Sequence, residues 1–176
     1  MNENKKNIFV IGGCRSGKSG HALKLADEFK QKKIFIATCV PRDEEMKMRI
    51  RQHQEERGKN WNPLEIPVKI SEAIAEVSST ADIILVDCLT LWVSNLLLES
   101  ASMDFVMEHA KLLEQAVEKS NCPVIFVSNE VGTGIVPENQ IARLFRDAAG
   151  FVNQKIARVC DQVVWMVAGI PVTIKG

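Results

Sequence analysis

Residues 7–19 read Asn-Ile-Phe-Val-Ile-Gly-Gly-Cys-Arg-Ser-Gly-Lys-Ser, an apolar run that leads into a glycine-rich turn. Gly12–Ser19 fits the pattern G-x-x-x-x-G-K-S, which binds nucleotide phosphates when a strand precedes it and a helix follows. Both neighbours are present, because Asn7–Ile11 is a β-rich apolar run and Lys18–Gln31 has a helical pattern. The stretch therefore predicts a phosphate-binding loop, or P-loop, at the start of an α/β fold.

The residue types of this P-loop suit the binding of a nucleoside triphosphate. Glycines let the backbone curl until successive N–H groups point at phosphate oxygens, and the following helix adds its positive N-terminal end. Lys18 supplies a positive charge for the β- and γ-phosphates, and Ser19 supplies a hydroxyl ligand for Mg²⁺. We therefore expect ATP or GTP to be held by Gly12, Gly13, Cys14, Arg15, Ser16, Gly17, Lys18 and Ser19.

Besides the Ser19 hydroxyl, a carboxylate is expected close to the metal ion of a P-loop site. Ile83–Asp87 has the required form, which is four apolar strand residues that end in an acid. Asp87 is therefore predicted to act on Mg²⁺, directly or through water. The alternative is that Asp87 caps a helix predicted over Leu89–Glu99, and the sequence leaves both roles open.

Short β-rich runs alternate with longer amphipathic segments, so we expect one domain over residues 1–176. The expected strands are Asn7–Ile11, Lys33–Thr38, Asp82–Asp87, Pro123–Ser128, Gln162–Ala168 and Val172–Lys175. The expected helices are Lys18–Gln31, Asp43–Arg57, Ser71–Ser78, Leu89–Glu99, Met103–Lys119 and Asn139–Val159. Such strands predict a RecA-like α/β fold with a mostly parallel, doubly wound sheet. A tight turn at Gly169-Ile170-Pro171 makes the last strand an antiparallel edge strand.

The charge balance argues against a polyanionic partner. The chain has 22 basic and 22 acidic residues, so no broad basic field attracts nucleic acid or an anionic membrane. No apolar run reaches the length of a transmembrane helix. The five cysteines are scattered without a Cys-x-x-Cys pair, a pattern that favours neither a zinc site nor a disulfide framework. We expect a cytoplasmic protein that neither binds nucleic acid nor inserts into a membrane.

A second group of polar residues lies on the helix predicted over Asp43–Arg57. At helical spacing, six residues share one face: Met46, Arg49, Ile50, His53, Gln54 and Arg57. Two arginines beside a histidine form an anion site that contains a nucleophile. A single helical histidine is more often structural, so residue type alone leaves both roles open for His53. His21 and His109 are given the structural role.

Further motifs extend over nearly the whole chain. They are Ile36-Ala37-Thr38, Asp43-x-Glu45-Met46-x-x-Arg49-Ile50-x-x-His53-x-x-x-Arg57, Trp61-x-x-x-Glu65, Asn129-Glu130-Val131-Gly132-x-Gly134-Ile135-Val136-Pro137-Glu138-Asn139, Phe145-Arg146-Asp147-x-x-Gly150-x-Val152-Asn153-Gln154 and Gly169-Ile170-Pro171. Together with the P-loop, they resemble the bifunctional adenosylcobinamide kinase/adenosylcobinamide-phosphate guanylyltransferase family of cobalamin biosynthesis. The motif over Asn129–Asn139 is much more specific than the P-loop.

This resemblance implies two reactions. The first phosphorylates the aminopropanol hydroxyl of adenosylcobinamide with ATP or GTP. The second transfers GMP from GTP to the new phosphate through a guanylyl-histidine, giving adenosylcobinamide-GDP and pyrophosphate. In this chain the resemblance makes His53 the nucleophile, with Lys18 and Asp87 as the other catalytic residues. The further nucleotide-binding residues that we expect are Thr38, Cys39, Gln54, Arg57 and Glu65.

The resemblance also implies a corrinoid substrate and a homotrimer whose active sites lie near subunit contacts. The segment Asn129–Asn139 either lines the corrinoid side or is a structural turn followed by a helix cap at Asn139, and both readings stay open. Two other functions are also possible for the sequence. One is a P-loop small-molecule kinase without guanylyl transfer, in which His53 is idle, and the other is a P-loop regulatory ATPase.

Overall fold

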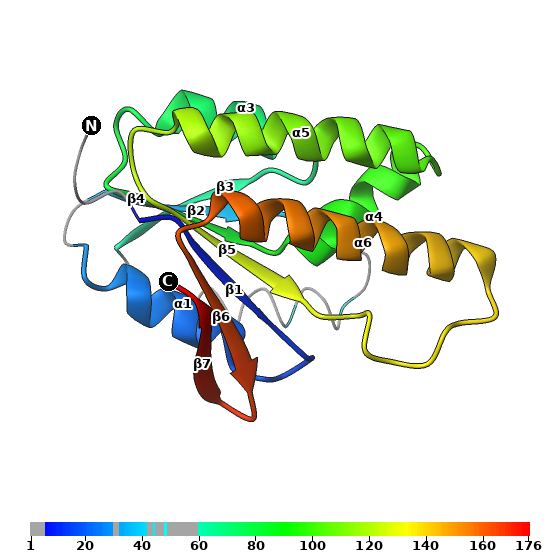
Figure 1. The fold of residues 1–176 in the computed structure, drawn as a ribbon. Helices are drawn as coiled ribbons and strands as arrows, with labels where there is room; N and C mark the ends of the chain where they lie inside the picture. The colour runs from blue at the N-terminus through cyan, green and yellow to red at the C-terminus, as the bar shows by residue number, and fades with distance from the viewer. Residues whose placement is uncertain (1–5, 30–31, 42–43, 45–47, 49–59) are drawn as a thin grey trace.

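The structure, a computed structural model, describes residues 6–29, 32–41, 44, 48 and 60–176 (Figure 1). Its seven strands form one sheet in the order β3 (Trp61–Glu65), β2 (Lys33–Ala37), β4 (Ile83–Asp87), β5 (Val124–Asn129), β1 (Ile8–Gly12), β6 (Gln162–Val167) and β7 (Ile170–Lys175). The first six strands are parallel, and β7 is antiparallel to β6. The predicted, mostly parallel sheet is therefore confirmed.

Helices cover both faces of this sheet, because its strands are apolar on both sides. Figure 1 shows helices on either side of the sheet. The first face carries α1 (Lys18–Ala26). The second face carries α3 (Ile70–Val77), α4 (Leu89–Glu99), α5 (Met103–Lys119) and α6 (Gln140–Val159).

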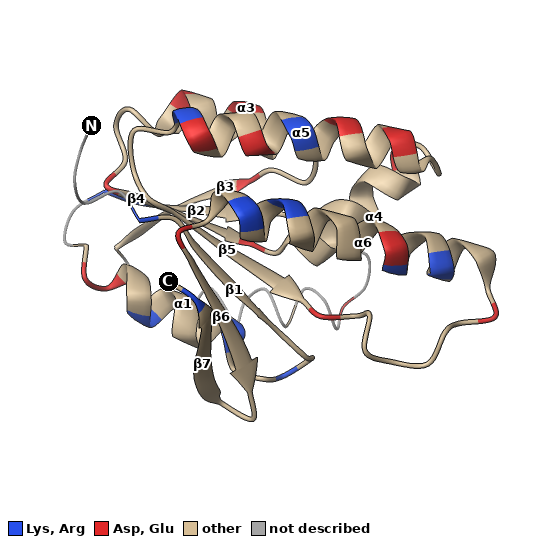
Figure 2. Cartoon of the chain, in the orientation of Figure 1, with Lys and Arg blue, Asp and Glu red and all other residues tan. Residues whose placement is uncertain are grey.

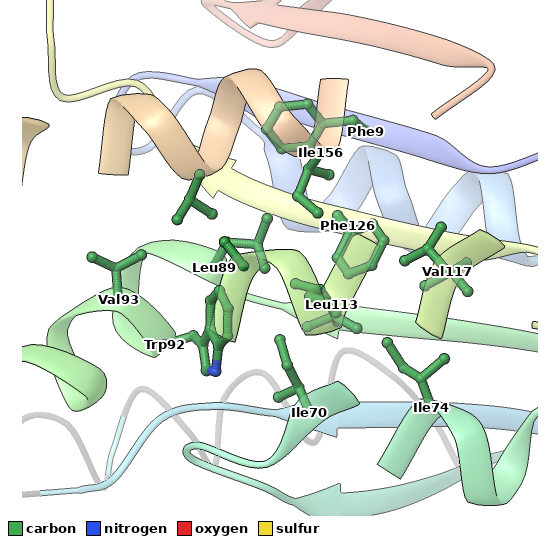
Figure 3. Close-up of a cluster of buried hydrophobic side chains, with 14 of the residues drawn as sticks. Phe9, Ile70, Ile74, Leu89, Trp92, Val93, Leu113, Val117, Phe126 and Ile156 are labelled. Atoms are coloured by element: carbon green, nitrogen blue, oxygen red, sulfur yellow. The ribbon is translucent and has the colours of Figure 1, made fainter. Parts of the chain in front are cut away.

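Alternate residues of the central strands supply two hydrophobic cores. On β4, Ile84 and Val86 belong to the core beneath α3–α6, whereas Ile83 and Leu85 belong to the core beneath α1. Figure 3 shows part of the larger core, where Trp92 is fully buried and its indole N–H donates to the Val68 carbonyl at 2.7 Å. Both cores hold the strands rigidly, so the loops at the strand ends start from fixed positions.

The strand β3 is absent from the sequence prediction. Trp61 is buried and packs edge-on against Phe35, with ring centroids 6.0 Å apart, but most of the strand is exposed. Pro63 removes a backbone donor, which sheets tolerate at an edge. Trp61 is therefore the side chain that anchors this edge strand. The segment lacks the apolar pattern from which a strand could be predicted.

The last hairpin is antiparallel as predicted, but its turn lies earlier than Gly169-Ile170-Pro171. Ala168 and Gly169 form the turn with φ values of 50° and 83°, and β7 already begins at Ile170. Two successive positive φ values are typical of the two-residue turns that match strand twist. The helix α1 also differs, because it ends at Ala26 instead of Gln31.

The surface of the helical layer carries both signs of charge. Figure 2 shows basic and acidic residues interspersed along α5 and α6, in agreement with equal numbers of each in the sequence. Among the described residues, no helix is long and apolar enough to cross a membrane.

Candidate nucleotide-binding site

The P-loop starts where β1 ends, at the carboxyl edge of the sheet. Gly12 has no room for a side chain, because an added Cβ would collide with the Met166 carbonyl oxygen and lie 2.9 Å from Ser16 Oγ. Gly17 has a φ of 90° and forms the N-cap of α1, a conformation that glycine adopts without strain. Two of the three P-loop glycines are thus required by the observed backbone path.

The Lys18 side chain folds back across the loop. Its Nζ donates to the Gly13 carbonyl at 2.5 Å and lies 3.5 Å from Ser16 Oγ. The residue is only 7% exposed, and burial lowers the pKa of Lys18, while its electrostatic interactions with Cys88, Asp87 and Cys14 oppose that shift. The ammonium group thus sits inside the curl of the loop, where a phosphate oxygen can replace the Gly13 carbonyl as its partner.

A contact that the sequence does not reveal holds the loop from the other side. The Gly169 N–H in the β6–β7 turn donates to the Ser16 carbonyl at 3.1 Å. A Cβ on Gly17 would lie 3.4 Å from Gly169 Cα, so the two turns pack closely. The C-terminal hairpin therefore supports the P-loop.

Asp87 lies at the carboxyl end of β4, and strand alternation places it on the α1 face with Ile83 and Leu85. It contributes to the electrostatics of Lys18, so the carboxylate and ammonium groups belong to one site. The N-cap of α4 is Cys88, without a side-chain cap bond, so Asp87 lies one residue before the cap position and its metal role stays a prediction.

Thr38 joins the ends of β2 and β4. Its hydroxyl donates to the Cys88 carbonyl at 2.7 Å and accepts from the Cys88 N–H at 2.8 Å, and the residue is completely buried. Direct nucleotide contact by Thr38 stays a prediction, since in this structure its hydroxyl is engaged with Cys88. Burial, helped by the charge of Asp87, raises the pKa of the Cys88 thiol to about 12, so this cysteine is no thiolate nucleophile at neutral pH.

The end of β5 lies directly beside the P-loop. Asn129 pairs in register with Gly12, and the Glu130 N–H donates to the Gly12 carbonyl at 3.0 Å. Thr90 at the start of α4 fixes this strand end, because its hydroxyl accepts from the Asn129 N–H at 2.7 Å. Asn153 of α6 donates to the Asn129 carbonyl at 3.3 Å.

The sequence prediction gives no role to Thr90 or Asn153. Asn153 lies within the quoted motif over Phe145–Gln154, and it is a polar residue within the apolar face of α6, beside Val152 and Ile156.

The segment after β5 is exposed and is held in shape by α6. Arg146 donates to the Gly132 carbonyl, and Arg143 donates to the Pro137 carbonyl at 3.1 Å. Asn139 caps α6 by accepting from the Ala142 N–H at 3.0 Å, so the predicted cap is confirmed. Ile135 at the tip is 96% exposed. The segment thus ends in a helix cap and also exposes an apolar side chain. A corrinoid contact at this loop stays a prediction.

Of the remaining predicted residues, the structure describes Glu65 and Cys39. Glu65 is exposed at the end of β3, and three strands lie between β3 and β1, a separation of roughly 19 Å at the usual strand spacing. Cys39 follows β2 and is half-buried. His53, Gln54 and Arg57 lie outside the described residues, in the segment that joins β2 to β3.

Comparison with known sequences shows the family of the chain. A family model described as "Cobinamide kinase / cobinamide phosphate guanyltransferase" matches residues 8–174. The chain is 40% identical to the bifunctional adenosylcobalamin biosynthesis protein CobP of Pseudomonas aeruginosa, covering 95% of this chain and 96% of that protein. It is also 40% identical to CobU of Salmonella typhimurium and 38% identical to CobU of Escherichia coli, covering in both cases 96% of this chain and 99% of the relative.

Two solved structures share the fold at low sequence identity. A protein from Pyrococcus horikoshii OT3 aligns with a TM-score of 0.58 and 10% identity over 97% of this chain and 86% of its own. The RadB recombinase aligns with a TM-score of 0.51 and 15% identity over 91% of this chain and 73% of its own. The predicted RecA-like α/β fold is therefore confirmed.

Proposed function

The chain belongs to the cobinamide kinase / cobinamide phosphate guanyltransferase family, and on this premise we propose how its residues divide the two reactions. It is an enzyme of cobalamin biosynthesis with both activities. It phosphorylates adenosylcobinamide and then transfers GMP from GTP to the new phosphate. The observation that carries the assignment of residues is the closed P-loop, with Lys18 folded across it on the same face as Asp87.

In the kinase step, the P-loop holds ATP or GTP by its triphosphate. The substrate hydroxyl attacks the γ-phosphorus, a new P–O bond forms, and the bond to the nucleoside diphosphate breaks. Lys18 exchanges the Gly13 carbonyl for phosphate oxygens and balances their charge. The residues Gly13, Cys14 and Arg15 are exposed, so their backbone N–H groups are accessible to the phosphates.

The residues around Lys18 fit a Mg²⁺ ion. Asp87 and Ser19 offer a carboxylate and a hydroxyl, which are the oxygen ligands that Mg²⁺ prefers. Within the described part of the chain, no three His, Cys, Asp or Glu side chains form a metal-binding group, so the other ligands would be phosphates and water. When bound, the ion would neutralise charge on the phosphates.

In the second step, we assign the nucleophile to His53. Its neutral imidazole nitrogen attacks the α-phosphorus of GTP, a P–N bond forms, and pyrophosphate leaves. A phosphate oxygen of adenosylcobinamide phosphate then attacks the same phosphorus, which breaks the P–N bond and releases the histidine.

The chain order shows which strands precede and follow the proposed nucleophile. The segment that carries His53, Gln54 and Arg57 joins β2 to β3, so the ends marked by Cys39 and Glu65 flank it. The P-loop lies on the other side of β4 and β5.

The direct test is incubation of the protein with adenosylcobinamide and GTP, followed by mass analysis of the products. We expect adenosylcobinamide phosphate first and adenosylcobinamide-GDP with pyrophosphate later. Phosphate transfer without the later product would indicate a small-molecule kinase. Nucleotide hydrolysis without any corrinoid product would indicate a P-loop ATPase.

We also propose a homotrimer. The outer hairpin presents exposed apolar side chains: Trp165, Val167, Ile170, Val172 and Ile174. The first four are cross-strand partners, so they share a face of the sheet, which suits burial against another copy. Light scattering should give three times the chain mass of 19.6 kDa; one chain mass would contradict the trimer.

Finally, we propose that the enzyme works in the cytoplasm, where thiols stay reduced. None of the five cysteines forms a disulfide, and three of them are buried. Cell fractionation of a native source should place the protein with cytoplasmic markers.

A further inference from the structure

Asn153 combines strong burial with an unused hydrogen-bonding group. The residue is 7% exposed, and its Nδ2 donates to the Asn129 carbonyl at 3.3 Å. Its Oδ1 is buried and has no partner in the described part of the chain. The orientation of the amide is determined, because the Asn129 carbonyl is only an acceptor and the group that faces it must be the NH₂.

An arrangement of this kind is unfavourable for stability. Leaving a buried acceptor unpaired costs about 1–3 kcal/mol. The neighbours of Asn153 on the buried face of α6 are apolar: Ala148, Ala149, Val152 and Ile156. An apolar residue at position 153 would remove the unpaired oxygen and would pack among side chains of the same apolar kind. Packing alone therefore does not account for the asparagine.

The bond that Asn153 does make acts on the strand end beside the P-loop. The peptide groups around Asn129 are held at three points: Thr90 binds its N–H, Asn153 binds its carbonyl, and the Glu130 N–H binds the Gly12 carbonyl. Such a set of bonds fixes the backbone at Asn129, and with it the direction of the Cα–Cβ bond from which the side chain extends.

That side chain lies on the α1 face of the sheet. Strand alternation places Asn129 on the face of Ile125 and Val127, which pack in the core beneath α1. Asp87 lies on the same face of the adjacent strand β4, and Gly12 lies beside Asn129 on β1. The half-buried Asn129 is thus between the carboxylate and the P-loop.

We propose that Asn153 is a positioning residue for phosphoryl transfer. It holds the Asn129 carbonyl so that the Asn129 amide meets the terminal phosphate of the bound nucleoside triphosphate, between Lys18 and Asp87. The proposal rests on the kinase reaction assigned above. It predicts that Asn153 contributes to the rate of the reaction and little to the stability of the fold.

The chain provides a matched control at the other end of the same strand. Asn7 is 6% exposed, and its Oδ1 accepts from the Val124 N–H at 3.1 Å where β5 begins. Both asparagines are therefore buried and both hold β5, one at its start and one at its end. Only Asn153 holds the end that lies beside the P-loop.

The experiment compares Asn153→Ala, Asn129→Ala and Asn7→Ala in the full chain. We measure kcat and KM for ATP in the phosphorylation of adenosylcobinamide, and the melting temperature of each variant. For Asn153→Ala we expect kcat to fall about tenfold to hundredfold, with KM for ATP within about threefold and little change in melting temperature. For Asn7→Ala we expect the reverse, a lower melting temperature and an unchanged kcat.

A double mutant tests whether Asn153 acts through Asn129. Asn129→Ala should lower kcat by a similar factor, and the combined variant should be no slower than the slower single variant, because both changes remove one interaction. Independent, multiplying losses would overturn the proposal, as would a stable Asn153→Ala variant with wild-type kcat. A wild-type protein that does not phosphorylate adenosylcobinamide would instead contradict the proposed function.

Discussion

The two edges of the sheet use the same residue types in opposite ways. At the amino edge, Lys33 is 6% exposed, and its Nζ lies 2.9 Å from the Asp27 carboxylate and 5.6 Å from the centre of the Trp61 ring. At the carboxyl edge, Lys18 is 7% exposed, and the partners of its Nζ are a carbonyl and a hydroxyl of its own loop. At equal burial, Lys33 thus lies within hydrogen-bonding distance of a carboxylate, whereas the hydrogen-bond partners of Lys18 are uncharged and the Asp87 carboxylate acts on it through its charge.

The asparagines repeat this contrast. Asn7 at the amino edge uses its side chain to pair a backbone N–H, and its own N–H donates to Asp161 Oδ2 at 2.7 Å. Asn153 at the carboxyl edge keeps one buried oxygen unpaired. At the amino edge, the protein's own groups thus pair the polar groups of Asn7. At the carboxyl edge, a buried acceptor stays available for a hydrogen bond from outside the protein. Ligand sites in open α/β sheets lie at this carboxyl edge.

The largest expected effect belongs to the proposed nucleophile and separates the two reactions. His53→Ala removes the proposed nucleophile and leaves Gly12–Ser19 and Asp87 intact. We expect protein labelling by α-labelled GTP and guanylyl transfer to fall by about 10⁴-fold or more, while kinase activity persists. His109→Ala is the matched control and should label normally. Wild-type labelling of His53→Ala would mean that another residue is the nucleophile.

The two lysines provide the next test of the contrast between the edges. Lys18→Met should lower both activities by about 10²–10³-fold, because both reactions use the same triphosphate cradle. Lys33→Met exchanges an equally buried lysine at the amino edge, and its kcat values should stay within about twofold. Steady-state kinetics of both reactions checks this pair. Near wild-type phosphorylation by Lys18→Met would show that the P-loop assignment is wrong.

Two acids at opposite ends of β4 sharpen the same comparison. Asp87→Asn should raise the Mg²⁺ concentration needed for half-maximal kinase activity by about tenfold or more, because a proposed metal ligand loses its charge. Asp82 precedes the strand and accepts from the Lys32 N–H at 2.9 Å, so Asp82→Asn should leave the Mg²⁺ requirement unchanged. Nucleotide binding without metal is measured in parallel. An equal loss of metal-free binding in Asp87→Asn would contradict a metal role.

The sequence predicts the parts of the fold that depend on local patterns. The strands β1, β2, β4, β5 and β6 are mostly apolar, with polar residues only at their ends, so each one is visible as a run. The edge strand β3 has one buried anchor, Trp61, and a proline, and no periodicity distinguishes such a segment from a loop. Strand order also has no local signal, which is why the distance between Glu65 and the P-loop could not be expected from spacing.

The same limit applies to the candidate site. The P-loop is contiguous in the chain, so the pattern of Gly12–Ser19 predicts its shape and position directly. The contacts that support it join distant residues, as in Gly169 with Ser16 and Asn153 with Asn129. A sequence read alone shows that these residues are polar or small, but only the packed sheet shows that they meet.

The smallest expected effect tests the structural role of the amino edge. Lys175 at the end of β7 donates from Nζ to the last carbonyls of α6, at 2.9 Å to Ala157, 3.0 Å to Arg158 and 2.6 Å to Cys160. A cation at a helix C-terminus stabilises the helix dipole and satisfies carbonyls that have no partner within the helix. Lys175→Met should therefore cost about 1 kcal/mol, which lowers the melting temperature of a chain of this length by roughly 2–4 °C. Lys111 is exposed in the middle of α5, so Lys111→Met should leave the melting temperature nearly unchanged. Both variants should keep wild-type kcat, because neither lysine lies at the carboxyl edge. A kinetic defect in Lys175→Met with an unchanged melting temperature would show that the division between a structural and a functional edge does not hold.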